Sequence, residues 1–123
     1  MLLIRDDQMR VLARHAQERF AVRAVAHLKR VLPEECAAMG EPAVRNSVDM
    51  AIRKAESYGI EEELDVLRYL NLMYALGFDF DTDPETAWAA EVLQDKDLDP
   101  GSKVELLWDR VESEADAGEG SVG

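Results

Sequence analysis

Apolar residues recur at every third or fourth position along most of this chain, a spacing typical of amphipathic α-helices. The first run predicts a long helix over residues 6–32. Its apolar face comprises Met9, Leu12, Ala16, Phe20, Ala24, Leu28 and Val31. A short helical segment is predicted from Pro33 to Met39, because proline suits a first helical turn and Gly40 suits a helix end. No segment shows the strict alternation of a half-buried strand.

Two further helices are predicted over residues 42–58 and 61–76. Gly59 is a strong stop for the first of them, and Ile60 is expected to pack back over that stop. The inward residues predicted for residues 42–58 are Val44, Val48, Ala51, Ile52 and Ala55. Those predicted for residues 61–76 are Leu64, Leu67, Leu70, Met73, Tyr74 and Leu76.

The last part of the chain predicts two short helices, over residues 84–94 and 100–114, paired as a hairpin. Their expected apolar contacts are Trp88, Val92, Leu93, Val104, Leu107, Trp108 and Val111. Residues 116–123 are polar and glycine-rich and are predicted to form a disordered tail. The sequence therefore predicts an all-α fold: a compact single-domain helical bundle over residues 1–115, with a long N-terminal helix and a short C-terminal helical hairpin.

Length and composition agree with one globular domain: 123 residues, of which 47% are hydrophobic and 33% charged. The apolar start at residues 1–4 is interrupted by Arg5, Asp6 and Asp7, so it is too short for a signal peptide. No run approaches the roughly 20 apolar residues that cross a bilayer. Cys36 is the single cysteine, which excludes an internal disulfide. We therefore expect a cytoplasmic protein.

The net charge of −12 is unevenly distributed. Residues 1–32 hold seven Lys/Arg against three Asp/Glu, a net +4, so the rest of the chain sums to −16. Such a molecule repels nucleic acid over most of its surface, and we expect neither nucleic acid nor, for lack of an apolar span, a membrane as a partner. A surface with charge of both signs favours selection of a protein partner by complementary charge.

The segment from Gly77 to Pro84 alternates acids and aromatics. Its aspartates Asp79, Asp81 and Asp83 match the opening of a calcium-binding loop, but proline replaces the glycine required at the sixth position and Ala90 replaces the glutamate at the twelfth. Capping chemistry explains the segment better. Gly77 ends one helix, Asp83 accepts hydrogen bonds from the N–H groups of the next, and the other aspartates face water while Phe78 and Phe80 pack on the core.

Catalytic chemistry has little support in the residues. Cys36 with His15 or His27 is a conceivable nucleophile and base, yet no known local signature surrounds Cys36. Zinc needs three or four converging ligands, and one cysteine and two histidines nearly exhaust the supply. There is no phosphate-binding glycine loop and no dinucleotide fingerprint. We therefore expect a non-enzymatic protein with no catalytic residues, no cofactor and no metal.

Large aromatic residues serve both cores and protein-binding surfaces, and the helical spacing of the tryptophans and tyrosines favours the core. An aromatic rim beside acidic loops also suits a docking surface. The predicted partner-binding residues are Tyr58, Tyr69, Phe78, Asp79, Phe80, Asp81 and Asp83. The binding mode expected is a partner helix laid into a groove between the helix at residues 61–76 and the terminal hairpin.

Several runs of residues resemble a family of small acidic helical proteins encoded beside effector, spike-tip and adaptor genes of bacterial type VI secretion systems. These runs are 58–60, 64–66, 68–74, 77–84 and 88–89, with similar stretches at 4–9 and 33–36. The resemblance implies an accessory protein, an adaptor or co-chaperone, that binds a secreted effector or its chaperone in the producer's cytoplasm and assists its stability or loading. The alternative is an immunity protein that neutralises a cognate toxin through its acidic surface.

Overall fold

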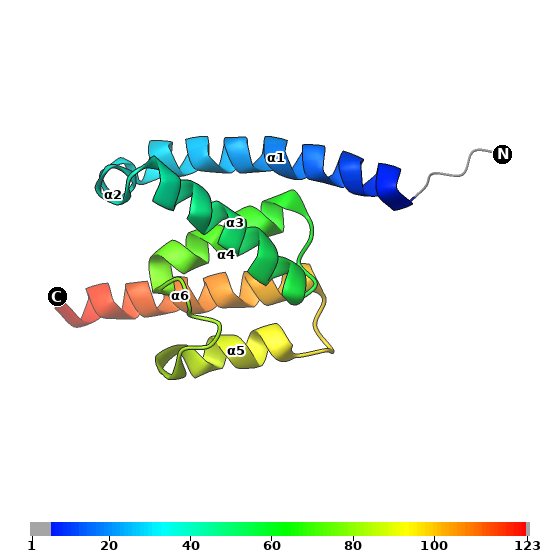
Figure 1. The fold of residues 1–123 in the computed structure, drawn as a ribbon. Helices are drawn as coiled ribbons and strands as arrows, with labels where there is room; N and C mark the ends of the chain where they lie inside the picture. The colour runs from blue at the N-terminus through cyan, green and yellow to red at the C-terminus, as the bar shows by residue number, and fades with distance from the viewer. Residues whose placement is uncertain (1–5, 123) are drawn as a thin grey trace. The chain divides into compact units, whose positions relative to one another are not determined.

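The protein is described here from a computed structural model that defines the backbone of residues 6–122 and the side chains of residues 14–114. Helices account for all the regular structure in this part of the chain (Figure 1). In chain order they are α1 (Asp6–Val31), α2 (Pro33–Met39), α3 (Glu41–Ser57), α4 (Glu63–Leu76), the 3-10 turn η1 (Pro84–Thr86), α5 (Ala87–Gln94) and α6 (Pro100–Val122). The prediction of an all-α fold is confirmed.

The chain divides into two compact units, residues 1–49 and residues 50–123, and the boundary falls within α3. The first unit contains α1, α2 and the start of α3, and the second contains the remainder. The predicted single domain over residues 1–115 falls across both units.

In the first unit, α1 buries the middle of its predicted apolar face. Phe20, Ala24 and Leu28 are buried as expected, together with Ala21. Ala16 and Val31 are exposed, so the predicted face is wrong in those two places, and the side chains of Met9 and Leu12 lie outside the described residues. A helix buries only the stretch that other elements cover, and in α1 that stretch runs from Phe20 to Leu28.

In the second unit, α4 and α6 pack side by side and run in the same direction, while α5 packs on α6 in the opposite direction (Figure 1). Their shared core consists of Val66, Tyr69, Leu70, Leu72, Met73, Ala89, Leu93, Val104 and Leu107. Leu64, predicted to point inward, is 60% exposed. It shares one helix face with Arg68 and Asn71, at i, i+4 and i+7, and that face is directed away from the core.

Local signals set most helix ends. At the end of α3, the N–H of Gly59 donates to Glu56 O at 2.9 Å and the N–H of Ile60 donates to Ala55 O at 2.8 Å, the paired bonds of a Schellman motif. Gly59 has a φ of 80°, which favours glycine, and Ile60 is fully buried behind it as predicted. Lys103 of α6 donates to the carbonyl of Tyr58 at 3.3 Å, which places a cation at the negative end of α3.

The last helix differs from its prediction. It was expected to end near Glu114, before a disordered tail at residues 116–123, whereas α6 continues to Val122. Extending a helix that has already formed requires no new nucleus, so residues of modest helix propensity join it readily. Gly123 and the side chains after Glu114 lie outside the described residues.

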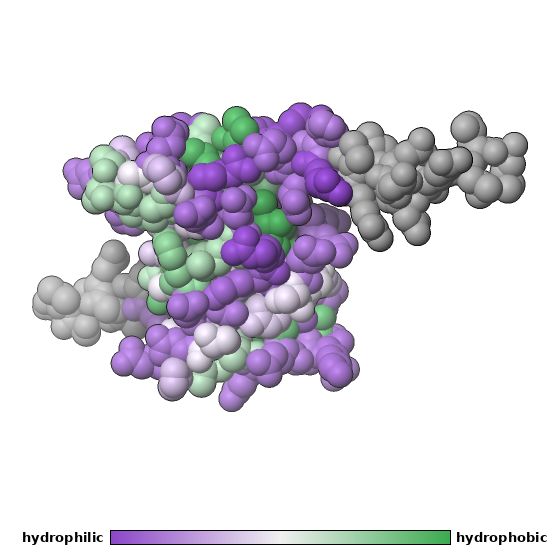
Figure 2. All heavy atoms as spheres, in the orientation of Figure 1, coloured by the Kyte–Doolittle hydropathy of each residue, from purple (hydrophilic) through white to green (hydrophobic). Residues whose placement is uncertain are grey.

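Hydrophilic residues cover most of the visible surface in Figure 2, with hydrophobic residues scattered between them. The large apolar side chains with substantial exposure among the described residues are Val22, Val31, Leu64 and Leu106. No helix in the described part of the chain is both long enough and apolar enough to cross a membrane.

Candidate functional site

The loop between α4 and η1, residues 77–83, is held by a lysine from α3. The ammonium of Lys54 donates to Asp79 Oδ1 at 2.9 Å, to Asp81 Oδ1 at 2.8 Å and to the carbonyl of Phe78 at 2.9 Å. The hydroxyl of Tyr58 donates to the second oxygen of Asp81, Oδ2, at 2.8 Å. We call Lys54, Tyr58, Asp79 and Asp81 the lysine clasp.

The clasp corrects the expectation that the aspartates outside the cap face water. The side chain of Asp79 is 78% exposed, but that of Asp81 is only 6% exposed. Lys54 is also largely covered, at 21%. A carboxylate enters such a position when an opposite charge and hydrogen bonds replace its water, and Lys54 and Tyr58 provide both.

Asp83 has the capping role that the sequence predicted. Its carboxylate accepts a hydrogen bond from the N–H of Glu85 at 2.9 Å, at the start of η1, where Pro84 occupies the first turn. Asp79 and Asp81 therefore share the Lys54 ammonium, Asp81 also accepts the Tyr58 hydroxyl, and Asp83 accepts a backbone N–H. In the part of the chain that the structure describes, no group of three or more His, Cys, Asp or Glu is placed to hold a metal ion.

Burial divides the predicted partner-binding residues into two groups. Tyr69, Phe80 and Asp81 are buried, so they support the loop and present no contact surface. The rings of Tyr69 and Phe80 lie 5.1 Å apart between centroids. The half-buried and exposed group, available for contact, comprises Tyr58, Phe78, Asp79 and Asp83.

The clasp shifts the pKa values of its members. Burial raises the pKa of Tyr58 to about 12, and its hydrogen bond to Asp81 acts in the same direction. Burial alone would lower the pKa of Lys54, but the hydrogen bonds to Asp81 and Asp79 outweigh it, and the pKa is raised. Both groups therefore keep their protons to higher pH in the folded protein than in the unfolded chain.

We expect the free energy of unfolding to fall as the pH rises above about 10, where unfolded tyrosine and lysine lose their protons. The clasp contribution is complete below that pH, and it is lost as the pH passes through the raised folded pKa values of Tyr58 and Lys54. Urea unfolding followed by circular dichroism measures this free energy, at intervals of about half a pH unit between pH 8 and pH 11.5. The variant Tyr58→Phe should show a flatter decline, and identical declines in both proteins would contradict the assignment.

The hydroxyl of Tyr69 is buried and has no hydrogen-bond partner within the described residues. Removing an unsatisfied buried hydroxyl relieves its desolvation cost, so Tyr69→Phe should leave stability unchanged or raise it by about 1 kcal/mol. Tyr58→Phe is the matched control, since it loses the bond to Asp81 and should be destabilised at neutral pH. Chemical denaturation of both variants tests this, and a clear loss of stability in Tyr69→Phe would show that its hydroxyl has a partner.

Cys36 lies buried in α2, and its surroundings oppose reactivity. Burial raises the pKa of its thiol, and the neighbouring Glu35 raises it further. A nucleophilic cysteine needs the opposite shift, toward the thiolate. His15 is exposed, and His27 has its Nδ1 3.5 Å from the guanidinium of Arg30. The charge of Lys29 lowers the pKa of the thiol, but burial and Glu35 outweigh it, so the net shift opposes a role for Cys36 as a nucleophile.

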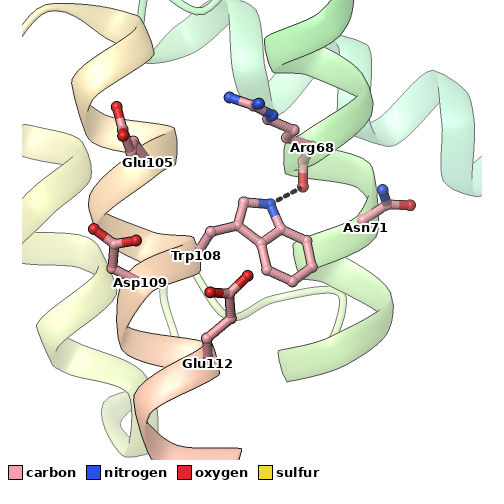
Figure 3. A pocket seen from close by; sticks show the side chains of 6 residues that line it. All are labelled: Arg68, Asn71, Glu105, Trp108, Asp109 and Glu112. Carbon is pink, nitrogen blue, oxygen red and sulfur yellow. Dashed lines mark hydrogen bonds between the residues drawn. The ribbon is translucent and has the colours of Figure 1, made fainter.

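A groove between α4 and α6 is the second candidate site, and we call it the acidic groove (Figure 3). It has a volume of about 560 Å³. Its lining residues are Arg68 and Asn71 from α4 and Glu105, Trp108, Asp109 and Glu112 from α6. The indole N–H of Trp108 donates to the backbone carbonyl of Arg68 at 3.3 Å, which fixes the ring between the two helices.

Three acids line the groove from α6, and we call them the groove carboxylates: Glu105, Asp109 and Glu112. Among the side chains of residues 14–114, none pairs with them through an ion pair or a hydrogen bond. They belong to a strongly acidic unit, because residues 50–123 hold six Lys/Arg against nineteen Asp/Glu, a net −13. The α6 side of the groove is therefore negatively charged, and no described side chain of the protein neutralises it.

The sequence predicted a partner-binding groove between the helix at residues 61–76 and the terminal hairpin, but none of the predicted partner-binding residues lines the groove between α4 and α6. Trp108 was predicted to be buried at helical spacing, but it is only partly buried and lines the groove. The available signal was the spacing of the acids at 105, 109 and 112, which places them on the same helix face as Trp108.

No protein-family model matches the chain, and no curated protein or solved structure is significantly similar to it.

Proposed function

We propose that this chain is a non-enzymatic accessory protein that binds another protein through the acidic groove. The observation that carries the proposal is the groove itself, which lies open between two parallel helices. It holds a fixed, partly exposed tryptophan and three carboxylates that pair with no side chain of residues 14–114. Partly exposed aromatics beside a polar rim are typical of protein-binding sites. A groove between two helices also has the shape that accepts a third helix.

Charge narrows the class of partner. A net charge of −13 on the second unit opposes nucleic acid and anionic membrane surfaces. The same field raises the association rate of a partner with a basic patch and selects against acidic proteins. A basic protein segment is therefore the best-matched occupant.

The resemblance to proteins of type VI secretion gene clusters supplies a context for this binding. In that context the partner is a secreted effector or the chaperone that loads it. The protein would then work in the cytoplasm of the producing cell, where loading takes place.

A second candidate, an immunity protein, is favoured by the acidity alone. A toxin that acts on nucleic acid has a basic active site, and an acidic surface can occupy it in place of phosphate. The two candidates differ in consequence, since only an immunity protein protects a cell that expresses the toxic domain by itself.

Affinity capture of the tagged protein from its native host, at low and then high salt, tests the proposal. Recovery of one effector or adaptor by the native chain, and its loss from a variant with neutral groove carboxylates, is the expected result. Partners that remain bound to that variant in full would contradict a role for the acidic groove. Co-expression with the isolated toxic domain then separates the two candidates, and growth of the co-expressing cells would favour immunity.

A further inference from the structure

We infer that the acidic groove binds the arginine side chains of a basic helix, with one guanidinium stacked on the ring of Trp108 among the groove carboxylates. This inference rests on the proposed function, because it names the chemistry of the partner at the same site. It commits to a helical segment of another protein that carries arginines on one face.

Trp108 is positioned for stacking before any partner arrives. Its N–H is already used in the bond to the Arg68 carbonyl, so the indole offers its ring and no hydrogen-bond donor. Figure 3 shows the ring lying across the groove with the carboxylate of Glu112 beside it. A flat cation that stacks on an indole gains from the ring quadrupole, and adjacent carboxylates add to that attraction.

The protein contains the same type of contact a short distance along α6. The guanidinium carbon of Arg110 lies 4.9 Å from the ring centroid of Trp88 on α5. Arg110 also donates to Glu114 at 2.9 Å, so this internal site combines an indole, a guanidinium and a carboxylate. The acidic groove offers the indole and the carboxylates of such a site. Its own arginine, Arg68, lies on the α4 side, and no cation is stacked on Trp108 among the described side chains.

The spacing of the groove carboxylates selects a helix as the carrier of the arginines. They occupy positions i, i+4 and i+7 of α6, which form one row along the helix. A partner helix with arginines at the same spacing places one cation opposite each carboxylate. Arginine is preferred over lysine because its planar guanidinium both stacks on an aromatic ring and pairs with a carboxylate through two parallel hydrogen bonds.

The α4 side of the groove sets the orientation of the partner. Arg68 and Asn71 line that side, and neither residue attracts a further cation. A helix that enters the groove must therefore turn its arginine face toward α6 and a neutral or acidic face toward α4. A helix rotated so that its arginines face α4 would bring them against the like charge of Arg68. The groove therefore accepts the helix with only one face turned toward α6.

The test uses the full chain and capped alanine-based helical peptides of about 18 residues, long enough to be partly helical in water. One peptide carries arginines at i, i+4 and i+7, and two matched peptides carry lysine or the neutral isostere citrulline at those positions. Calorimetry at low salt should give the order arginine, then lysine, then citrulline. The preference for arginine over lysine should be about threefold, the value expected for one exposed stacking contact.

Two variants connect that order to the groove. The triple variant Glu105→Gln, Asp109→Asn, Glu112→Gln should weaken the arginine peptide by about tenfold, since each exposed pair contributes up to about 1 kcal/mol. Its matched control is Glu56→Gln, Glu61→Gln, Glu91→Gln, which removes the same charge from exposed positions outside the groove and should change binding less than about threefold.

Trp108→Leu tests the stacking contact: it should retain the charge dependence and lose the preference for arginine over lysine. Circular dichroism checks that each variant is folded.

Three results of the peptide experiments would overturn the inference, and a fourth result, from sedimentation, would do the same. The three are equal weakening by the two triple variants, a preference for arginine that survives in Trp108→Leu, and failure of the arginine peptide to bind the native chain at low salt. In the last case the proposed function stands if host capture still recovers a partner through the groove. Salt-sensitive dimers in sedimentation, lost in the groove variant, would instead assign the groove to a second copy of this chain and overturn the inference.

Discussion

Replacing Lys54 with methionine should lower the free energy of unfolding by about 3 kcal/mol, because the change leaves the carboxylate of Asp81 buried without its counter-ion. Lys54 makes three hydrogen bonds to the loop, and the side chain of Asp81 is only 6% exposed. Methionine preserves most of the side-chain volume, so the effect reports the lost charge and its hydrogen bonds and not a cavity. Urea unfolding at pH 7, followed by circular dichroism, measures the difference.

Two comparisons make this result specific. Lys96→Met alters an exposed lysine and should change stability by less than about 0.5 kcal/mol. Adding Asp81→Asn to Lys54→Met should recover part of the loss, because an amide needs no counter-ion and still accepts the hydroxyl of Tyr58. If Lys54→Met were as stable as the native protein, the clasp would be a surface feature and not a support for the loop.

Replacing Phe80 with alanine should cost about 3–4 kcal/mol, the range typical of a phenylalanine removed from a close-packed core. Phe80 is 1% exposed and its ring packs on that of Tyr69. The cavity would open directly beneath the aspartate loop, so the variant should also loosen the clasp. Thermal and chemical denaturation give the size of the loss, and hydrogen exchange of the amides at residues 77–83 shows the loosening.

Phe78→Ala is the internal comparison for that prediction. Phe78 is half-buried, and its ring packs edge-to-face on Tyr74 with the ring centroids 5.1 Å apart. Its replacement should therefore lower the free energy of unfolding by roughly 1 kcal/mol. Equal costs at the two positions would contradict the division of the loop into a buried support and an exposed rim. A cost at Phe80 below about 1 kcal/mol would show that the loop can collapse onto the space.

The sequence predicted the elements of the fold because their signals are local. A glycine after an apolar run, an aspartate before a proline and a period near 3.6 residues each act within one or two turns, and most helix bounds fall within two residues of their predictions. Asp83 is the clearest case, since its capping bond spans two residues.

Features that depend on distant residues could not be predicted in the same way. Lys54 stands 27 residues before Asp81, and nothing within the loop shows that a cation from α3 covers it. The apolar composition of α4 likewise gave no means to choose between the face of Leu64 and the face of Val66, because both are hydrophobic. Only the packing of α4 on α6 decides which face is buried and which one borders the groove.

The distribution of rare side chains gives this protein a built-in probe for each unit. Both tryptophans, Trp88 and Trp108, lie in residues 50–123, and the single thiol, Cys36, lies buried in residues 1–49. Intrinsic fluorescence therefore follows one half of the chain, while the rate at which a maleimide labels the native thiol follows the other, with no engineered label. Coincident transitions from the two signals would mean that the halves unfold together, and separate transitions would give each half its own stability.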